Sequence, residues 1–317
     1  MKYALIFPGQ GSQETGMGKD LFDTFEVARE TFLSADDALG FDLSRIIFNG
    51  PEDELQKTAF TQPAILTMSI AVYRVMVELL GKLPQPAYVA GHSLGEYTSL
   101  VAAGSISLEE GVKLVHLRGR LMQEAVPIGK GSMAAILGMD PEQVRSICEE
   151  VSLEGVCEAA NYNSPGQVVI SGEADAIDKA VSMASARGAK KAVKLKVSAP
   201  FHSSLMLPVS SKLREEALRC SWKEPYCPVV ANSKAQPEQK VENIIECLVE
   251  QTHMPVLWSD SVEYMYLHGV DTFYELGPGK VLSGLVRKCV KGTNVYAAGD
   301  LKTLESLLNV MKGGETE

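Results

Sequence analysis

The chain has 317 residues and a formal net charge of −10, from 30 Lys and Arg against 40 Asp and Glu. With 45% hydrophobic and 22% charged residues, its composition is that of a folded globular protein, which excludes a disordered or fibrous chain. The acidic balance also argues against nucleic acid or an anionic membrane as the main partner. At this length we expect one large domain carrying a smaller second unit.

The N-terminal part alternates strand-like segments with segments of helical periodicity. An apolar strand pattern over residues 3–7 is followed by a helical region to residue 39, a helix over 63–80 and a strand over 87–90. Such alternation predicts a largely parallel sheet with helices on both faces. Polar residues interrupt the apolar stretch 64–80, so it predicts a buried helix and no membrane span.

The middle of the chain has a different order of elements. Its pattern is strand, helix, strand, strand, helix, strand, with predicted bounds 132–138, 141–151, 157–163, 167–172, 174–187 and 191–197. This is the order of a ferredoxin-like unit.

The alternating pattern then resumes, with strands predicted at 229–232 and 272–275 and helices at 244–251 and 280–290. The middle unit is therefore predicted to be an insertion in the larger domain. The predicted division is a large lobe over residues 1–130 and 198–310, a small lobe over 131–197 and a disordered tail over 311–317.

Cysteines and the N-terminus indicate the compartment. The six cysteines form no C-x-x-C pair, in a chain long enough to fold without disulfides. The N-terminal apolar run is short for a signal peptide and stops at Pro8. We expect reduced thiols and a cytoplasmic protein. Without H-E-x-x-H, and with only five histidines, no metal site is expected.

Residues 91–95 fit the nucleophile-elbow motif G-x-S-x-G. A strand-like run enters the motif and a helix-forming run leaves it, which is the context that the motif requires. Ser93 is then a candidate nucleophile, and the amide of Leu94 would stabilise an oxyanion. The alternative is a glycine-rich turn with a helix-capping serine.

A serine nucleophile needs a base, and histidine is the usual one. His202 is the strongest candidate, because it follows a strand where the chain is expected to cross between lobes. The alternative is an ordinary histidine in a surface loop. The other four histidines have weaker support from their positions: His92, His116, His253 and His268.

Arg118 shares the apolar stripe of its helix, with leucines at 114, 117 and 121. A core-facing guanidinium needs an anion. Two partners remain open at this point, a buried Asp or Glu or the carboxylate of a substrate.

Two glycine-rich segments do not match the nucleotide-binding motifs. Residues 9–14 depart from G-x-G-x-x-G at Glu14, and residues 277–281 depart from the P-loop at Val281. The first segment follows strand 3–7, where open α/β sheets bind ligands.

Five motifs together resemble the malonyl-CoA:acyl carrier protein transacylase family, in its discrete bacterial form. They are Gly-Gln-Gly-Ser-Gln at 9–13, Gly-His-Ser-Leu-Gly-Glu-Tyr at 91–97, Arg118, Ala-Pro-Phe-His at 199–202 and Gly-Pro-Gly-Lys at 277–280. Their order and spacing match the family over nearly the whole chain. The resemblance implies an α/β fold with an α/β-hydrolase-like large lobe and an inserted ferredoxin-like small lobe.

The resemblance also assigns catalytic roles. Ser93 matches the nucleophile, His202 its base, and Gln251 the position whose backbone carbonyl orients the histidine. The implied dyad explains why no Asp or Glu stands out as a third triad member. The amides of Gln10 and Leu94 match the oxyanion hole.

The implied reaction moves a malonyl group from malonyl-CoA to the phosphopantetheine thiol of acyl carrier protein, for fatty acid biosynthesis. Arg118 matches the residue that binds the malonyl carboxylate, and Phe201 resembles the malonyl-preferring form of the wider acyltransferase family. No permanently bound cofactor is implied, since the coenzyme A thioester is a substrate. Alternatives are a trans-acting acyltransferase of a polyketide pathway, a serine thioesterase or esterase, and a non-catalytic scaffold that binds carrier protein.

An acidic carrier protein needs a local basic patch on an acidic enzyme. We expect a monomer with one of two docking patches, although a solvated, lysine-guarded strand edge explains the first equally well. The small-lobe patch is Arg187, Lys190, Lys191, Lys194 and Lys196, and the C-terminal patch is Arg287, Lys288 and Lys291.

Overall fold

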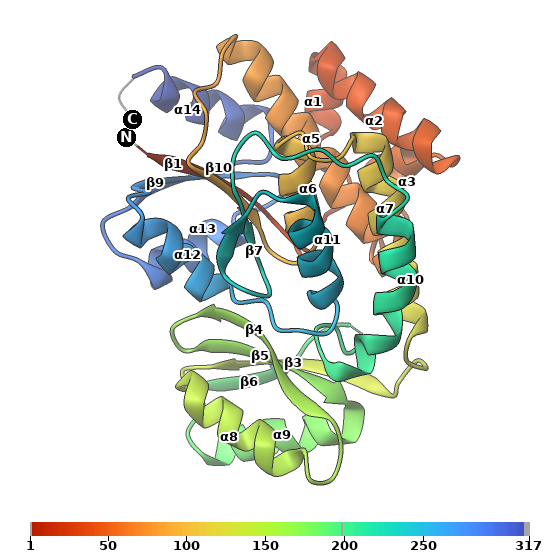
Figure 1. The fold of residues 1–317 in the computed structure, drawn as a ribbon, viewed down its shortest axis with the longest axis vertical. Coiled ribbons are helices and arrows are strands. Elements are labelled where there is room, and N and C mark those ends of the chain that lie inside the picture. The colour runs from red at the N-terminus through yellow and green to blue at the C-terminus, as the bar shows by residue number, and fades with distance from the viewer. Residues whose placement is uncertain (1, 198, 314–317) are drawn as a thin grey trace.

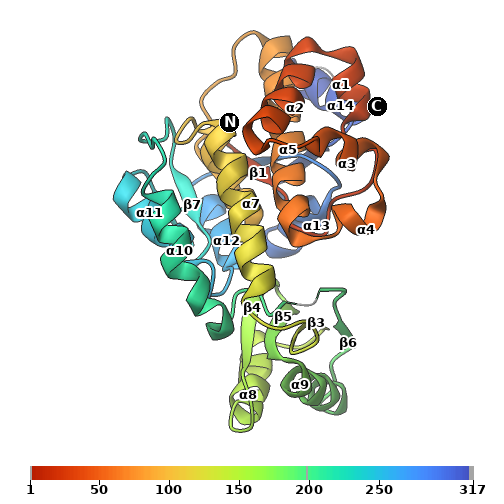
Figure 2. The same ribbon diagram turned by 90° about the vertical axis from the view of Figure 1, so that its right-hand side faces the viewer.

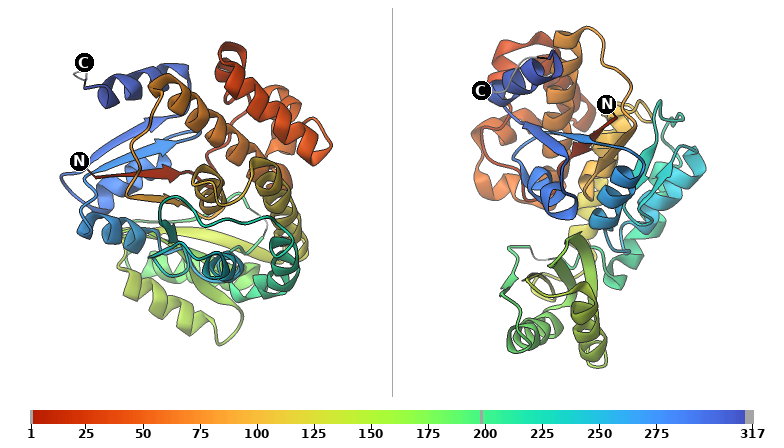
Figure 3. Two further views of the ribbon diagram at one scale, coloured as in Figure 1. Left: turned by 45° about the horizontal axis from the view of Figure 1, so that its top comes forward. Right: turned by 90° about the vertical axis from the view of Figure 1, so that its left-hand side faces the viewer.

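The computed structural model describes residues 2–197 and 199–313. The chain forms two lobes, each built on its own sheet (Figure 1). Side views show the smaller lobe projecting from one end of the larger one (Figures 2 and 3). The mixed α/β fold predicted from the sequence is confirmed.

The large lobe contains a six-stranded sheet in the order β10-β9-β1-β2-β7-β8. The first five of these strands pair in parallel, and β8 pairs antiparallel to β7 at one edge. The strands are β1 (Tyr3–Phe7), β2 (Tyr88–Gly91), β7 (Val229–Ala231), β8 (Gln236–Glu238), β9 (Thr272–Leu276) and β10 (Asn294–Ala298).

Strand β1 is central in this sheet and every residue in it is buried. Leu5 and Phe7 join the larger core, whereas Ala4 and Ile6 join the core on the other face of the sheet. Successive side chains of a strand point to opposite faces, so both faces must be covered by helices.

Helices cover both faces of the sheet. The larger core includes residues of α1 (Lys19–Thr24), α2 (Glu26–Leu39), α3 (Leu43–Asn49), α4 (Glu52–Leu55), α5 (Thr58–Leu80), α6 (Leu94–Ala102), α7 (Leu108–Glu124), α10 (Leu207–Ala217), α11 (Val241–Glu250) and α14 (Leu301–Met311). The opposite core includes residues of α12 (Trp258–Leu267) and α13 (Val281–Cys289).

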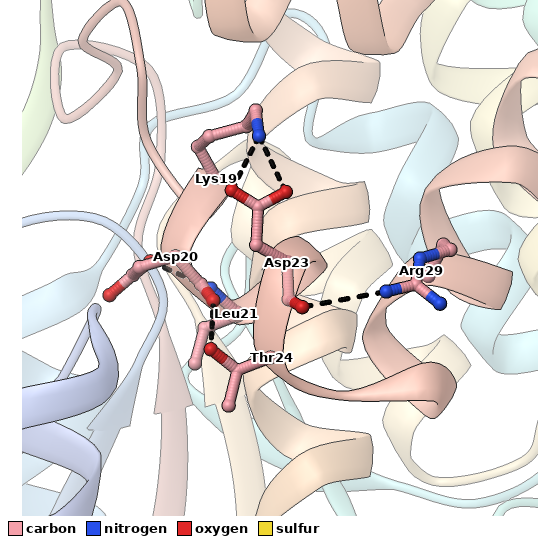
Figure 4. A network of polar contacts seen from close by, with 6 residues as sticks. All are labelled: Lys19, Asp20, Leu21, Asp23, Thr24 and Arg29. Atoms are coloured by element: carbon pink, nitrogen blue, oxygen red, sulfur yellow. Dashed lines mark hydrogen bonds and ion pairs between the residues drawn. The ribbon is translucent and has the colours of Figure 1, made fainter.

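The predicted helical region to residue 39 is two helices, because Phe25 has an extended backbone (φ −118°, ψ 129°). A local polar network closes the junction (Figure 4). Lys19 forms an ion pair with Asp23, whose carbonyl accepts a hydrogen bond of 3.4 Å from Arg29 on α2.

Helix α5 begins five residues before its predicted start and contains Pro63 in its interior. Proline lacks the N–H that would bond to the carbonyl four residues earlier. That carbonyl, of Ala59, instead lies 2.7 Å from Nδ1 of His116 on α7. By length and composition α5 resembles a membrane span, but 67% of its most apolar window is buried inside the protein, which confirms the predicted buried helix.

The small lobe contains an antiparallel sheet in the order β4-β5-β3-β6, packed against two helices. This is the ferredoxin-like arrangement that the sequence predicts. Its elements are β3 (Gly131–Leu137), α8 (Pro141–Val151), β4 (Cys157–Ser164), β5 (Gln167–Glu173), α9 (Ala174–Ala186) and β6 (Lys191–Lys194). Its boundaries at 131 and 197 stay a prediction, and Ser198 lies outside the described residues.

Strand β4 also contacts the large lobe directly. The backbone of Val256 donates to Ala160 at 2.8 Å, and its carbonyl accepts from Tyr162 at 2.9 Å. These bonds fasten the segment after α11 to the small lobe.

The elements that were not predicted include α3, α4, α12, β8, β10 and α14. Helix α14 extends to Met311, so the predicted disordered tail begins one residue too early. Most of that tail, residues 314–317, lies outside the described residues.

Candidate active site

Ser93 lies in a sharp turn between β2 and α6, with φ 51° and ψ −105°. A positive φ is costly for a non-glycine residue and is typical of functional sites. The turn requires glycine at both flanking motif positions. A Cβ on Gly91 would lie 2.0 Å from the carbonyl oxygen of Gly95, and a Cβ on Gly95 would lie 2.1 Å from that of Phe7.

The structure brings the predicted nucleophile and base together across 109 residues of sequence. Ser93 Oγ lies 2.8 Å from Nε2 of His202. His202 has a φ of 57° and precedes the short 3-10 helix η1 (Ser204–Met206). This residue is only 4% exposed, so the alternative of a surface-loop histidine is wrong.

The main-chain carbonyl of Gln251 lies 2.7 Å from the other ring nitrogen, Nδ1 of His202. A carbonyl only accepts, so Nδ1 carries the proton and Nε2 presents its lone pair to Ser93. Burial, followed by the positive charge of Arg118, lowers the pKa of His202 to about 3. The imidazole is therefore neutral at neutral pH and available as a base.

Arg118 is 1% exposed and lies beside the nucleophile. Its Nη2 donates to Ser93 Oγ at 3.1 Å and to Gln251 Oε1 at 2.8 Å, and Nη1 donates to Gln62 Oε1 at 2.8 Å. The guanidinium also stacks over Tyr97, at 5.3 Å from the ring centre. None of the ion pairs between described residues involves Arg118, so its direct partners here are neutral groups.

A cavity of about 110 Å³ lies between the lobes at this point. It is lined by Gln10, Gln62, His92, Ser93, Leu94, Arg118, Met122, Met133, Asn161, Leu195, Val197, Phe201 and His202. The lining thus combines one cation, polar groups and apolar side chains, which fits a small acyl group with one negative charge.

Comparisons with known proteins agree with this geometry. Residues 4–311 match the family model for the acyl transferase domain. The malonyl CoA-acyl carrier protein transacylase of Escherichia coli (strain K12) is 45% identical, and the match covers 98% of this chain and 99% of that protein. The chain belongs to this transacylase family.

Solved structures of transacylases match this structure over nearly the whole chain. The acyl-carrier-protein S-malonyltransferase of Bartonella henselae has a TM-score of 0.95 at 47% identity, covering 98% of this chain and 100% of that one. A malonyl-transacylase in complex with its type II polyketide acyl-carrier protein has a TM-score of 0.94 at 44% identity, with coverage of 98% and 100%.

Sequence reasoning missed several polar residues that surround the transacylase dyad. Asn163 on β4 bonds Nε2 of His92 at 2.8 Å, linking the elbow to the small lobe. Asn232, after β7, and Glu96, on α6, form a buried network behind the cavity. Glu96 directly follows the elbow motif and is the charged residue of α6, which was the available signal in the sequence.

The two basic patches differ in the contacts that their charged side chains form. In the small-lobe patch, Arg187 pairs with Glu150 at 2.5 Å and Lys194 with Asp178 at 2.6 Å. In the C-terminal patch, Lys288 reaches Gln167 of the small lobe at 3.2 Å.

Proposed function

We propose that this chain transfers the malonyl group of malonyl-CoA to the phosphopantetheine thiol of acyl carrier protein, as an acyltransferase supplying fatty acid biosynthesis. The observation that carries the proposal is a buried Arg118 that forms no direct ion pair with a described residue and lies 3.1 Å from the hydroxyl oxygen of Ser93. A carboxylate bound there by two parallel hydrogen bonds would hold its acyl carbon next to Ser93.

The first half-reaction acylates the serine. His202 Nε2 takes the hydroxyl proton as Ser93 Oγ attacks the thioester carbonyl. The developing oxyanion accepts hydrogen bonds from the backbone amides of Gln10 and Leu94, both of which line the cavity. The C–S bond then breaks, and the coenzyme A thiolate takes the proton from His202.

The second half-reaction regenerates the enzyme. His202 removes the proton of the phosphopantetheine thiol, whose sulfur attacks the malonyl ester, and the proton returns to Ser93. The Gln251 carbonyl keeps the imidazole in one tautomer through both steps without adding a negative charge near the bound carboxylate. The chemistry needs no cofactor beyond the thioester substrate.

Selection for malonyl follows from Arg118 and from the size of the cavity. Phe201 is 9% exposed and lines the cavity beside the base, where it limits room for branched acyl groups. All six cysteines are free thiols, which supports a reducing, cytoplasmic environment.

A second candidate is the same transfer to a carrier protein of a polyketide pathway. It is supported by the relative whose structure contains a type II polyketide carrier protein. The site chemistry is common to both, so only the carrier protein distinguishes them. A thioesterase or esterase is less well supported, since residues 4–311 match the acyl transferase domain and the relative of 45% identity is a transacylase.

The test is the intact mass of the protein after brief mixing with malonyl-CoA, for wild type and Ser93→Ala, followed by acyl carrier protein with its phosphopantetheine arm. A malonyl adduct only in wild type, passed to the carrier protein, is expected. An adduct that is lost to water at the same rate with and without carrier protein would support the hydrolase. The absence of any adduct would contradict the acyl-enzyme mechanism.

A further inference from the structure

Glu96 is a buried carboxylate that the reaction steps above do not use. It lies on α6, three residues after Ser93, and is 2% exposed. Its Oε2 accepts hydrogen bonds from the backbone N–H of Asn232 at 3.0 Å and from Nε2 of Gln251 at 2.6 Å. Glu96 is not among the described residues that line the cavity, so any effect on the reaction passes through these two partners.

Asn232 connects Glu96 to the strained elbow. Its Oδ1 accepts the backbone N–H of Ser93 at 2.6 Å, and its Nδ2 donates to the carbonyl of Gly91 at 2.7 Å. One amide thus bonds to the backbone on both sides of the turn. A positive φ at Ser93 persists only where surrounding contacts hold it, and these two bonds are such contacts.

Gln251 connects Glu96 to the base and to the arginine. Its backbone carbonyl accepts from His202, and its side-chain Oε1 accepts from Arg118. The carboxylate of Glu96 fixes the orientation of the Gln251 side-chain amide. With Nε2 bound to Glu96, Oε1 must face the guanidinium, whereas the flipped amide would set donor against donor.

We propose that Glu96 is a positioning residue whose carboxylate, through Asn232 and Gln251, fixes the geometry of Ser93, His202 and Arg118 together. The effect of Glu96 on malonyl binding by Arg118 rests on the proposed function. Its effect on the position of Ser93 is independent of that function.

The charge of Glu96 suits this role. A carboxylate in direct contact with Arg118 would compete with a substrate carboxylate, but Glu96 is separated from the guanidinium by the amide of Gln251. Its negative charge therefore compensates a buried cation while leaving that cation free to bind substrate. Hydrogen bonds to an ionised acceptor are also stronger than those to a neutral one.

Protonation of Glu96 should loosen the network. Burial raises the pKa of Glu96 to about 7, against the opposing effects of its two hydrogen-bond donors and of Arg118. Besides Arg118, the titratable groups that interact with Glu96 are Tyr97 and, on α11, Cys247, and His202 lies beyond Gln251. The pKa of His202 is lowered to about 3 and that of Cys247 is raised to about 11, so neither changes charge near pH 7.

The experiment compares Glu96→Gln with a matched control, Glu275→Gln. Glu275 is a fully buried carboxylate that accepts the backbone N–H groups of Leu282 and Ser283 at 3.0 and 2.6 Å, on α13. Two rates are measured between pH 5.5 and 8.5 (about 1.5 pH units either side of 7). The first is labelling of Ser93 by a fluorophosphonate, and the second is formation of malonyl-serine, which is compared with formation of acetyl-serine.

For Glu96→Gln, both rates are expected to fall on the order of 10- to 100-fold, because a small misplacement of reacting groups is costly. The malonyl-to-acetyl ratio should also fall, and the decline of the wild-type rate below pH 7 should disappear. Glu275→Gln should keep the wild-type rates, ratio and pH profile. Unchanged rates and profile for Glu96→Gln, or the same losses in Glu275→Gln, would overturn the proposal.

Two further outcomes stay informative. If Glu96→Gln does not fold, Asn232→Ser removes both bonds to the elbow and a long bond of 3.5 Å from Gln251, but it keeps the backbone N–H that binds Glu96. Labelling should then slow while the malonyl-to-acetyl ratio stays constant. An unchanged labelling rate would then overturn the proposal. If wild type reacts with fluorophosphonate but not with malonyl-CoA, the proposed function is wrong, and the labelling rates still decide the role of Glu96.

Discussion

The guanidinium of Arg118 lies 3.1 Å from the hydroxyl oxygen of Ser93, and no acidic side chain in the described part of the chain is hydrogen-bonded to it. Under the proposed function, the arginine would serve two purposes in this position. It would stabilise negative charge that develops on the nucleophile, and it would offer its remaining donor capacity to a carboxylate on the substrate. The sequence left the partner of Arg118 open, and the structure removes the alternative of a direct pair with Asp or Glu.

Replacing Arg118 with Ala should reduce the preference for malonyl. A charged hydrogen-bonded pair contributes a few kcal/mol, so the malonyl-to-acetyl ratio of acyl-serine formation should fall by about 10²-fold. The ratio is measured by intact mass after mixing with each thioester. Arg118→Lys is the control, since it keeps the charge but loses the two-pronged geometry, and it should give an intermediate ratio. An unchanged ratio in the Ala variant would rule out the carboxylate clamp.

Gly95→Ala should prevent correct formation of the elbow. Its new Cβ would lie 2.1 Å from the backbone oxygen of Phe7, and a main-chain atom in a central strand has little room to move. The control is Gly284→Ala on α13, where a Cβ would meet nothing within 4 Å. Alanine there should raise stability by up to about 1 kcal/mol, because it favours the helix.

Urea unfolding of both glycine variants measures these effects. Gly95→Ala is expected to lose several kcal/mol (about 1–3 or more for overpacking) and the reactivity of Ser93. Near wild-type stability for Gly95→Ala would show that β1 and α6 are not as closely packed as described.

His202 should make the free energy of unfolding depend on pH. Its pKa is lowered to about 3 in the folded protein from an ordinary value of 6.5, so between those values the unfolded chain binds more protons. Stability from this residue is therefore fully present above pH 6.5 and is lost as the pH falls towards 3. The slope for one proton is at most about 1.4 kcal/mol per pH unit.

This dependence is measured as the difference between wild type and His202→Asn in urea unfolding at several pH values. Wild type should lose more stability on acidification than the variant does. The exposed His268 supplies the control variant, His268→Asn, which should follow wild type. Parallel curves for wild type and His202→Asn would mean that the imidazole is not buried as a neutral base.

Charge reversal in the basic patches should affect only the second half-reaction. Lys191→Glu with Lys196→Glu, on the small-lobe patch, should raise the KM for acyl carrier protein several-fold, more at low salt than at high salt. The rate of malonyl-serine formation serves as an internal control, since the carrier protein takes no part in it. Lys288→Glu with Lys291→Glu tests the C-terminal patch in the same way, and an unchanged KM dismisses the patch concerned.

Most of the fold was predictable because it depends on local patterns. Strand β1 was predicted with its observed bounds, and the small lobe in its observed order of elements, since apolar alternation and turn residues signal both. Errors occurred where tertiary contacts replaced local signals. Pro63 indicated the start of a helix, but the helix continues through this proline. The carbonyl of Ala59, which Pro63 leaves without a helical partner, contacts His116 instead.

The sequence by itself determined the elbow, the candidate base and an arginine on a core-facing stripe, because each carries a side chain whose chemistry is recognisable at its position. Only the tertiary structure decided how they cooperate. The carbonyl of Gln251 near His202 is a main-chain atom, so only the family resemblance indicated it, and the structure supplied the 2.7 Å distance. Glu96 meets Asn232 and Gln251 across 136 and 155 residues. Hydrogen-bond partners that far apart come together only when the sheet and helices of the large lobe have packed.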